Sequence, residues 1–261
     1  MDLQLTGKVA LVTAASKGLG QATAVALARE GAKVAISARS ELIEETAAQV
    51  RAVGGEVLAI RGDVTVQADV DRMIADTIAE FGRIDILIIN AGGPPPGNFL
   101  DLNINDWQNG VDLTLMSAVR LCYGVIPHMV ENGGGSIVAI ESITIKQPVN
   151  NLILSNSIRL AVIGLLKSLS LEFGKHGIRI NSVNPTFTHT GRVDQILQAR
   201  AKASGTPVDE QMAALGASIP LGRIGTPEEF GRTVAWIASP AASFIHGTNL
   251  MFDGGSTANT V

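Results

Sequence analysis

The chain has 261 residues, of which 46% are hydrophobic and 17% charged, and its formal net charge is -4 at pH 7. This length suits one large domain, residues 1–261, with a substantial core. The acidic balance, with no run of Lys or Arg, argues against a nucleic-acid or anionic-membrane partner. We therefore expect the partner to be a small molecule.

Cys122 is the only cysteine, so neither an intrachain disulfide nor a cysteine-based zinc cluster can form. This favours a reducing cytoplasm. The N-terminus lacks the charged region, long apolar core and cleavage site of a signal peptide, and no apolar segment approaches the length that spans a bilayer. The expected location is therefore cytoplasmic, with no membrane partner.

Short runs of β-branched and apolar residues recur along the chain, and longer segments with helical periodicity separate most of them. Strands that alternate with helices predict right-handed crossovers and a parallel sheet. The expected fold is α/β: a single-domain, doubly wound parallel sheet of about seven strands with helices on both faces. The predicted strands are 9–13, 34–37, 57–60, 84–89, 137–140, 178–183 and 249–252.

A turn that contains glycine joins the first predicted strand to a helical pattern. Residues 13–20 read Thr-Ala-Ala-Ser-Lys-Gly-Leu-Gly, and apolar positions such as Ala24 and Leu27 follow at helical spacing. Glycines at a strand-to-helix turn let the backbone approach a pyrophosphate, whose charge the helix N-terminus stabilises. The turn predicts a dinucleotide site, although two glycines alone also occur in turns that bind nothing.

The segment 186–219 interrupts the alternation of strands and helices. It contains apolar positions at helical spacing, such as Val193, Leu197 and Met212, and no strand signal. In an open α/β sheet, ligands bind beyond the carboxyl ends of the strands. The segment therefore either covers a ligand or serves packing and subunit contact.

Residues 13–20 match the signature Thr-Gly-x-x-x-Gly-x-Gly with one departure, Ala14, which is tolerable if its φ stays negative. With the later motifs Asp63-Val64 and Asn90-Ala91-Gly92, the chain resembles the Rossmann-like short-chain dehydrogenase/reductase family from Gly7 to Gly255. The nearest resemblance is to its 3-oxoacyl-[acyl-carrier-protein] reductases. It implies that the cofactor contacts Thr13, Ala15, Ser16, Lys17, Gly18, Leu19, Gly20, Arg39, Asp63, Val64, Asn90, Ala91, Gly92, Arg159, Pro185, Thr188 and Thr190.

The choice of cofactor depends on the end of the second strand, which reads Ser37-Ala38-Arg39-Ser40. An acidic residue there would bind the adenosine ribose and repel a 2′-phosphate, and none is present. Arg39 can contact a phosphate, and Lys17 is the second basic residue that the family often uses for it. The pair favours NADP(H) over NAD(H), with two solvated cations as the alternative interpretation.

The family's proton-handling residues are largely replaced. The serine that stabilises the substrate oxygen matches Ser142, but the asparagine, tyrosine and lysine positions hold Thr114, Ser155 and Arg159. A tyrosine titrates near 10 and a serine hydroxyl is a far weaker acid, so Ser155 cannot simply take the tyrosine's role. Arg159 keeps a positive charge for a ribose hydroxyl or an oxyanion, but it cannot pass a proton at ordinary pH.

The chain contains other residues with side chains that titrate. Tyr123 lies on the opposite face of the helix predicted to carry Thr114, so we expect it to be structural. His189 and Lys146 are alternative donors, although each also fits a solvated loop residue. No spacing of His or acidic residues predicts a metal site.

The leading hypothesis is an NADP(H)-dependent oxidoreductase that acts on a carbonyl or alcohol by hydride transfer, with a non-standard proton donor. The alternative is a dinucleotide-binding protein that lacks dehydrogenase activity and acts as a sensor or structural partner. The resemblance also implies a homodimer or homotetramer formed through long helices. The apolar patterns of residues 104–129 and 156–173 are compatible with that assembly.

Overall fold

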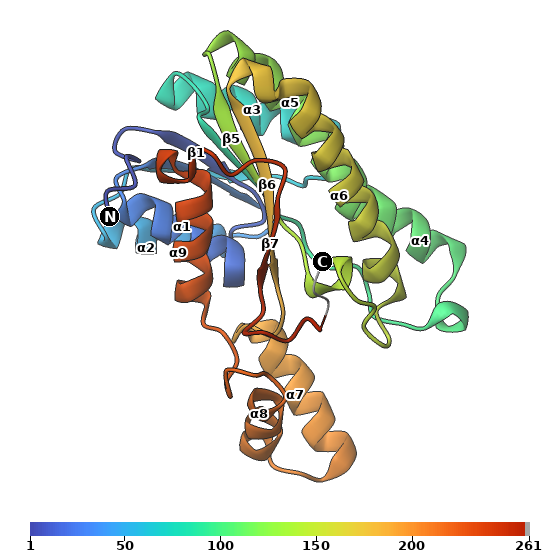
Figure 1. The fold of residues 1–261 in the computed structure, drawn as a ribbon. Coiled ribbons are helices and arrows are strands. Elements are labelled where there is room, and N and C mark those ends of the chain that lie inside the picture. Colours follow the sequence, from blue (N-terminus) through green and yellow to red (C-terminus); the bar gives the residue numbers. More distant parts are fainter. Residues whose placement is uncertain (259–261) are drawn as a thin grey trace.

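The computed structural model describes residues 1–258, without the side chains of 192, 195, 199, 200 and 203, so the last three residues of the predicted domain lie outside the description. Seven parallel strands form one sheet in the order β3-β2-β1-β4-β5-β6-β7. The expected α/β doubly wound fold is confirmed (Figure 1). The strands are β1 Val9–Val12, β2 Lys33–Ala38, β3 Val57–Arg61, β4 Ile86–Ile89, β5 Gly135–Ile140, β6 Ile178–Pro185 and β7 Asn249–Phe252.

Helices cover both faces of the sheet because the strands are apolar on both sides. Along β5, Val138 and Ile140 pack with the core of one face, while Ile137 and Ala139 pack with the core of the other. This alternation follows from the two-residue period of a strand. The first face is covered by α1 Gly18–Arg29, α2 Ile43–Ala52 and α9 Pro227–Ala238, and the second by α3 Gln67–Phe81, α5 Ser117–Glu131 and α6 Ile153–Phe173.

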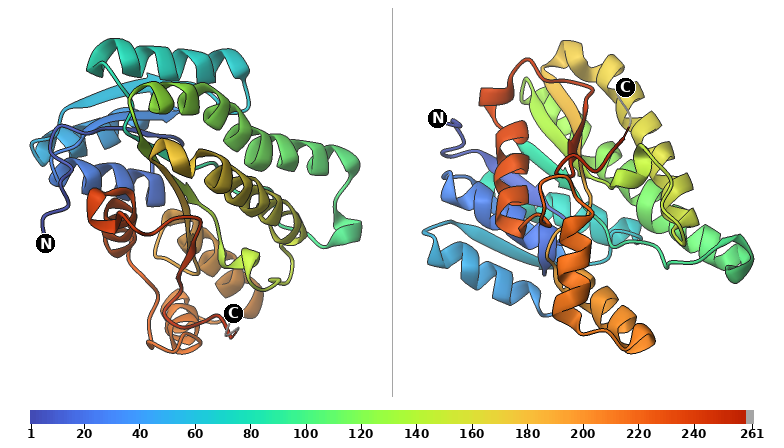
Figure 2. Two further views of the ribbon diagram at one scale, coloured as in Figure 1. Left: turned by 45° about the horizontal axis from the view of Figure 1, so that its top comes forward. Right: turned by 60° about the horizontal axis from the view of Figure 1, so that its bottom comes forward.

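The helical pattern predicted around Thr114 is not one regular α-helix. It divides into α4 Ile104–Val111, a π-helical segment η2 Asp112–Met116, and α5. A π turn inserts a residue into the helical ladder, and such turns occur frequently at functional sites. Figures 1 and 2 show α6 running alongside this composite helix, so the π turn faces the helix that carries Ser155 and Arg159. Short 3-10 turns complete the chain: η1 Phe99–Asp101, η3 Ile143–Ile145, η4 Gly174–His176 and η5 Pro240–Ala242.

The expectation that no apolar segment approaches the length that spans a bilayer was wrong. The continuous helical stretches Ile104–Glu131 and Ile153–His176 are long and apolar enough to cross a bilayer, each with a mean hydropathy of 1.3. In the structure both lie against the sheet, and Leu121, Val125 and Val162 are buried in the core there. A helix that packs against a protein core passes the same test of length and composition, so these stretches are weak support for a membrane span.

The segment 186–219 is helical, as its periodicity predicted. It forms α7 Gly191–Ser204 and α8 Val208–Ala217, which lie beyond the carboxyl end of β6 (Figure 1). Val193, Leu197 and Leu215 make a small apolar cluster of their own between these helices. The two helices therefore stand on the edge of the sheet where ligands bind in this architecture.

Candidate active site

The glycine-rich turn is tied to the fourth strand by hydrogen bonds. Thr13 Oγ1 donates to Asn90 O at 2.7 Å, and Asn90 Nδ2 donates to Ala14 O at 3.1 Å. A Cβ on Gly20 would lie 2.7 Å from both Ala14 O and Asn90 Nδ2, so no larger residue fits there. This close approach explains why the turn needs glycine at that position.

Ala14 departs from the family signature, and its backbone does not have the negative φ at which a methyl group is tolerable. Its φ is +48°, in the left-handed region, so it does not stay negative. The hydrogen bond between Asn90 and the Ala14 carbonyl accompanies this conformation. A residue with a Cβ in this region carries roughly 1–2 kcal/mol of steric cost, which glycine avoids.

We expect the substitution Ala14→Gly to stabilise the protein. The substitution relieves about 1–2 kcal/mol of steric strain in the folded state. Glycine loses more conformational entropy than alanine on folding, which offsets about 0.5–1 kcal/mol of this gain. The net gain in the free energy of unfolding is about 0.5–1 kcal/mol, measurable by urea denaturation. The control is Ala15→Gly, at a buried residue without positive φ, which should lower stability instead. Equal losses for both variants would contradict the strain at Ala14.

The N-terminus of α1 fits an anionic group. Its N-cap residue, Lys17, makes no side-chain cap, and the first turn of α1 carries no acidic residue. The first backbone N–H groups of the helix are therefore available to a phosphate, together with the positive end of the helix dipole. Gly18 has φ +61°, so the turn bends into the helix without a Cβ penalty. The residues present fit a dinucleotide pyrophosphate.

Arg39 and Asp63 lie together at the carboxyl ends of β2 and β3. Arg39 Nη1 is 3.7 Å from Asp63 Oδ2, and the Arg39 side chain is 75% exposed. Asp63 is also held by Thr65, whose backbone N–H and Oγ1 donate to Asp63 Oδ1. A long, exposed ion pair contributes little free energy, so the Arg39 guanidinium can turn to a bound phosphate at small cost.

Ser142 and Ser155 lie beside the 3-10 turn η3. Ser142 is its N-cap, and Ser142 Oγ accepts from the backbone N–H of Thr144 at 3.3 Å. Ser155, on the first turns of α6, is buried, and its carbonyl accepts from Thr144 Oγ1 at 3.5 Å. Thr144 therefore links the segment after β5 to α6. Lys146 follows directly as the C-cap of η3 and is half-buried.

Arg159 forms a buried ion pair with a residue that sequence reasoning did not select. Its Nη1 donates to Glu141 Oε2 at 2.9 Å, and the two side chains are only 12% and 4% exposed. Burial raises the pKa of Glu141, and the nearby Arg159 charge acts against that rise. Glu141 directly follows the apolar strand β5, and this isolated carboxylate after a buried strand was the available signal.

Thr114 occupies the π-helical segment and is buried. Its Oγ1 has no hydrogen-bond partner among the described residues, and the same holds for Arg159 Nε. Buried polar atoms are nearly always paired, so each unpaired atom calls for an explanation such as a bound water or ligand. The elements that carry Thr114 and Arg159 pack against each other. The two residues that the resemblance assigns to the family's asparagine and lysine positions thus carry unpaired polar atoms in a buried region.

The other predicted donor, His189, is turned toward a carboxylate. Its Nε2 lies 3.0 Å from Asp194 Oδ1, and both side chains are about half exposed. Thr190 is the N-cap of α7, and a Cβ on Gly18 would lie 3.5 Å from Thr190 Cγ2. The segment that leads into α7 therefore lies against the glycine-rich turn. Tyr123 is 78% exposed on α5 and is not part of this constellation.

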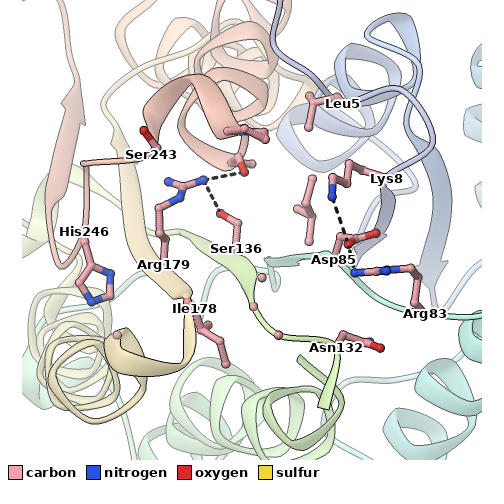
Figure 3. A pocket seen from close by; sticks show the side chains of 18 of the residues that line it. Leu5, Lys8, Arg83, Asp85, Asn132, Ser136, Ile178, Arg179, Ser243 and His246 are labelled. Atoms are coloured by element: carbon pink, nitrogen blue, oxygen red, sulfur yellow. Dashed lines mark hydrogen bonds and ion pairs between the residues drawn. The ribbon is translucent and has the colours of Figure 1, made fainter. Parts of the chain in front are cut away.

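A large cavity lies at the opposite edge of the sheet. It has a volume of about 730 Å³, and its walls come from the amino ends of several strands and the loops beside them (Figure 3). Asp85 pairs with Arg83 at 2.6 Å and with Lys8 at 3.7 Å, while Arg179 donates to the last two backbone carbonyls of α9. The cations on its wall thus have protein partners. The described residues contain no group of three His, Cys, Asp or Glu that could hold a metal ion.

Known proteins resemble this chain over nearly its whole length. A family model described as enoyl-(acyl carrier protein) reductase matches residues 13–257. The oxidoreductase UcpA of Salmonella typhimurium is 34% identical over 257 residues, covering 97% of this chain and 96% of that protein. The D-threitol dehydrogenase of Mycolicibacterium smegmatis is 35% identical over 260 residues, covering 98% of this chain and 95% of that protein.

A solved structure matches the fold closely. L-Sorbose reductase from Gluconobacter frateurii, complexed with NADPH and L-sorbose, has a TM-score of 0.95 at 30% identity, covering 99% of this chain and 100% of that one. These three comparisons agree with the seven-stranded parallel sheet and with the motifs at its carboxyl edge. The chain belongs to the short-chain dehydrogenase/reductase family.

Proposed function

We propose that the protein is an NADP(H)-dependent oxidoreductase that reduces a carbonyl or oxidises an alcohol. The observation that carries the proposal is the cradle at the glycine-rich turn: Gly20 leaves no room for a Cβ, and the uncapped N-terminus of α1 is open to a phosphate. The NADPH complex of the similar L-sorbose reductase supports the cofactor. UcpA and D-threitol dehydrogenase support redox chemistry.

The bound cofactor supplies or accepts the hydride. Residues 13–20 and the first turn of α1 bind its pyrophosphate, and Arg39 with Lys17 binds a 2′-phosphate. Asp63, Val64 and residues 90–92 are assigned to the adenosine side, and Pro185, Thr188 and Thr190 to the nicotinamide side. Ser142 orients the substrate oxygen by a hydrogen bond, which leaves a donor to be identified because Ser155 replaces the family tyrosine.

We further propose that segment 186–219 covers the substrate. The support is its position beyond the carboxyl end of β6 and the packing of Thr190 against Gly18. The small apolar cluster between α7 and α8 lets this pair of helices hold together while covering a ligand. Protection of this segment from proteolysis when NADPH and substrate are both bound is the expected result. Unchanged cleavage would contradict the covering role.

Rapid mixing with NADPH tests the proposed function. The substrate panel contains ketoses, cyclic ketones and aldehydes, because relatives act on a sugar and on a polyol. We expect substrate-dependent oxidation of NADPH. Saturable NADPH binding without turnover on any carbonyl would instead identify a dinucleotide-binding protein. The double substitution Ser155→Tyr with Arg159→Lys is the companion variant: loss of existing activity shows that the natural residues have their own mechanism.

We expect Arg39→Ala to weaken NADPH binding about tenfold and to leave NADH binding unchanged. A charge-assisted hydrogen bond contributes about 1.5–3 kcal/mol, less at an exposed site, and 1.4 kcal/mol is a factor of ten in affinity. Fluorescence titration gives both dissociation constants. The control is Arg51→Ala, in the last turn of α2. An equal loss for both cofactors would contradict a role of Arg39 in recognising the 2′-phosphate.

We propose that the chain forms a homodimer or homotetramer in the cytoplasm. The support is the exposed apolar surface of α5 and α6, where Tyr123 and Leu171 are each 78% exposed and Leu160 is 50% exposed. Apolar patches of this kind mark interaction surfaces. Cys122 is buried, and its thiol pKa is raised to about 12 by burial, so it plays no part in redox linkage between chains. Sedimentation velocity that finds only a single 27.2 kDa chain would contradict the assembly.

A further inference from the structure

Glu141 is a buried acid that directly precedes, in the chain, the serine assigned to the substrate oxygen. It follows the last residue of β5, and its backbone N–H donates to Val183 O at 3.1 Å, so the chain is still strand-like there. Its side chain is 4% exposed. Most carboxylates in proteins are exposed to solvent. A carboxylate this deeply buried needs a partner or a function.

The direction of the Glu141 side chain follows from strand alternation. Ile137 and Ala139 of β5 belong to the core on the face of α5 and α6, and Glu141 continues that alternation. Arg159 reaches it from α6 at 2.9 Å. The carboxyl group thus lies at the carboxyl edge of the sheet, between β5 and the helix that carries Ser155.

Two unpaired polar atoms belong to the same region. Arg159 Nε and Thr114 Oγ1 are buried and have no partner among the described residues. A water or a polar substrate group would satisfy them. The region around the pair therefore contains a carboxyl that can titrate, a fixed cation, and donors that lack an acceptor.

Other charged groups lie on the elements next to the pair. Asp112, on the π-helical segment packed against α6, pairs with Arg120 at 2.6 Å and is 41% exposed. Lys146 follows η3 and is half-buried. Arg159 is the charge that contacts Glu141, and burial raises the pKa of this carboxyl against the pull of that charge. A raised pKa brings a carboxylic acid toward the range useful for general acid catalysis.

We propose that the Glu141 carboxyl exchanges the proton with the substrate oxygen in the place of the missing tyrosine, and that Arg159 is its positioning residue. The proposal rests on the proposed oxidoreductase function. In reduction, the carbonyl carbon receives the hydride with its electron pair, and the oxygen takes the proton of the Glu141 carboxyl. The carboxylate left opposite Arg159 then takes a proton from water. Oxidation follows the reverse course.

The first test is Glu141→Gln, which keeps the shape of the side chain and its hydrogen bond from Arg159 but cannot titrate. We expect turnover to fall by about 10²–10⁴-fold, the usual contribution of a positioned acid. NADPH affinity and the thermal midpoint should stay near those of the parent. In the parent, the reduction rate should fall as pH rises through the pKa of Glu141, because the protonated form is the donor. This fall in rate, the pH limb, should be absent in the variant.

The matched control is Asp112→Asn, which makes the same change at a neighbouring carboxylate paired with Arg120. It should keep both the rate and the pH limb. Arg159→Lys retains a cation and should leave the limb near its position in the parent, whereas Arg159→Met removes the charge that lowers the pKa of Glu141 and should move the limb to higher pH. An unmoved limb in Arg159→Met would contradict its positioning role.

A readout independent of turnover is the titration of Glu141 itself. Carbon-13 NMR of protein labelled at the Glu carboxyl, with Glu141→Gln for assignment, should show one carboxyl titrating well above the exposed ones. If the pKa of Glu141 equals that of the exposed carboxyl groups, the proposal is overturned even if the enzyme is active. A parent that binds NADPH without turnover overturns the proposed function instead. Full activity and an intact pH limb in Glu141→Gln would overturn only the assignment of the donor.

Discussion

Replacing Arg179 by alanine is expected to lower the free energy of unfolding by about 3 kcal/mol or more. Arg179 lies on β6 and donates to the carbonyls of Ile237, Ala238, Ser239 and Ala242 at 2.8–3.2 Å. Ile237 and Ala238 end α9, Ser239 is the N-cap of η5, and Ala242 is its last residue. A helix end leaves its last carbonyls without partners. Each buried carbonyl left unpaired costs roughly 1–3 kcal/mol. The variant would leave those of Ile237 and Ala238 without a partner, whereas Ser239 O and Ala242 O also accept backbone N–H bonds.

The control for this prediction is Arg179→Lys. An ammonium offers three donors at one point, whereas the guanidinium offers five in a planar fork, so lysine should recover part of the stability. Urea denaturation gives the order parent, lysine variant, alanine variant. NADPH affinity should be unchanged in both folded variants, since Arg179 lies on the wall of the cavity at the opposite edge of the sheet (Figure 3). An alanine variant as stable as the parent would show that water satisfies these carbonyls.

The second large effect is expected from Gly231→Ala, because α9 and α1 pack with almost no space at this point. A Cβ on Gly231 would lie 2.5 Å from Ala22 O and 2.8 Å from Ala22 C, which are backbone atoms of α1. Backbone cannot rotate away as a side-chain end can, so the helices must move apart at a cost of about 2–3 kcal/mol. The N-terminus of α1 binds the phosphate in our proposal, so NADPH affinity should fall together with stability.

Gly124→Ala is the matched control, since it makes the same substitution inside another helix. Its Cβ would meet Ile74 Cδ1, the end of a flexible side chain. Alanine also favours the helix by about 0.8–1.0 kcal/mol over glycine, so the net change should be close to zero. Thermal unfolding and NADPH titration of both variants separate the effects. Similar losses at Gly231 and Gly124 would show that the contact with the α1 backbone is not what limits the position.

The strands were predictable from sequence for a clear physical reason. Parallel strands covered on both faces are continuous apolar runs, as β4 and residues 137–140 of β5 show. The same holds for the helical nature of residues 186–219, where Val193 and Leu197 repeat at helical spacing and pack together. The spacing of apolar residues along the chain shows which side chains are buried. Because strands and helices bury residues at different spacings, this pattern predicts the type of element.

Local backbone departures were not predictable in the same way. A π turn keeps the apolar residues of a helix close to their expected spacing, so the segment around Thr114 looks like an ordinary helix in sequence. The positive φ of Ala14 accompanies a tertiary hydrogen bond from Asn90, which comes from a strand far along the chain. The sequence pattern also did not predict the bilayer length of two helical stretches, because polar residues interrupt their apolar ones.

The partner of Arg159 shows the same limit at the candidate site. Family register predicts that Arg159 faces the site, yet its ion pair with Glu141 joins residues 18 positions apart on different elements. Spacing alone cannot bring a strand end and a helix together; packing of α6 on β5 does so. His189 was selected for its useful pKa range, but its contact with Asp194 depends on where α7 begins.

The most direct test of the central claim is isotope transfer from NADPH in which both hydrogens at C4 of the nicotinamide are replaced by deuterium. Enzyme, deuterated NADPH and a carbonyl panel are mixed, and the product alcohols are analysed by mass spectrometry. The oxidoreductase account predicts one deuterium on the carbinol carbon of a product, in a 1:1 ratio with NADP⁺ formed. NADPH that binds saturably while no product acquires deuterium would contradict it.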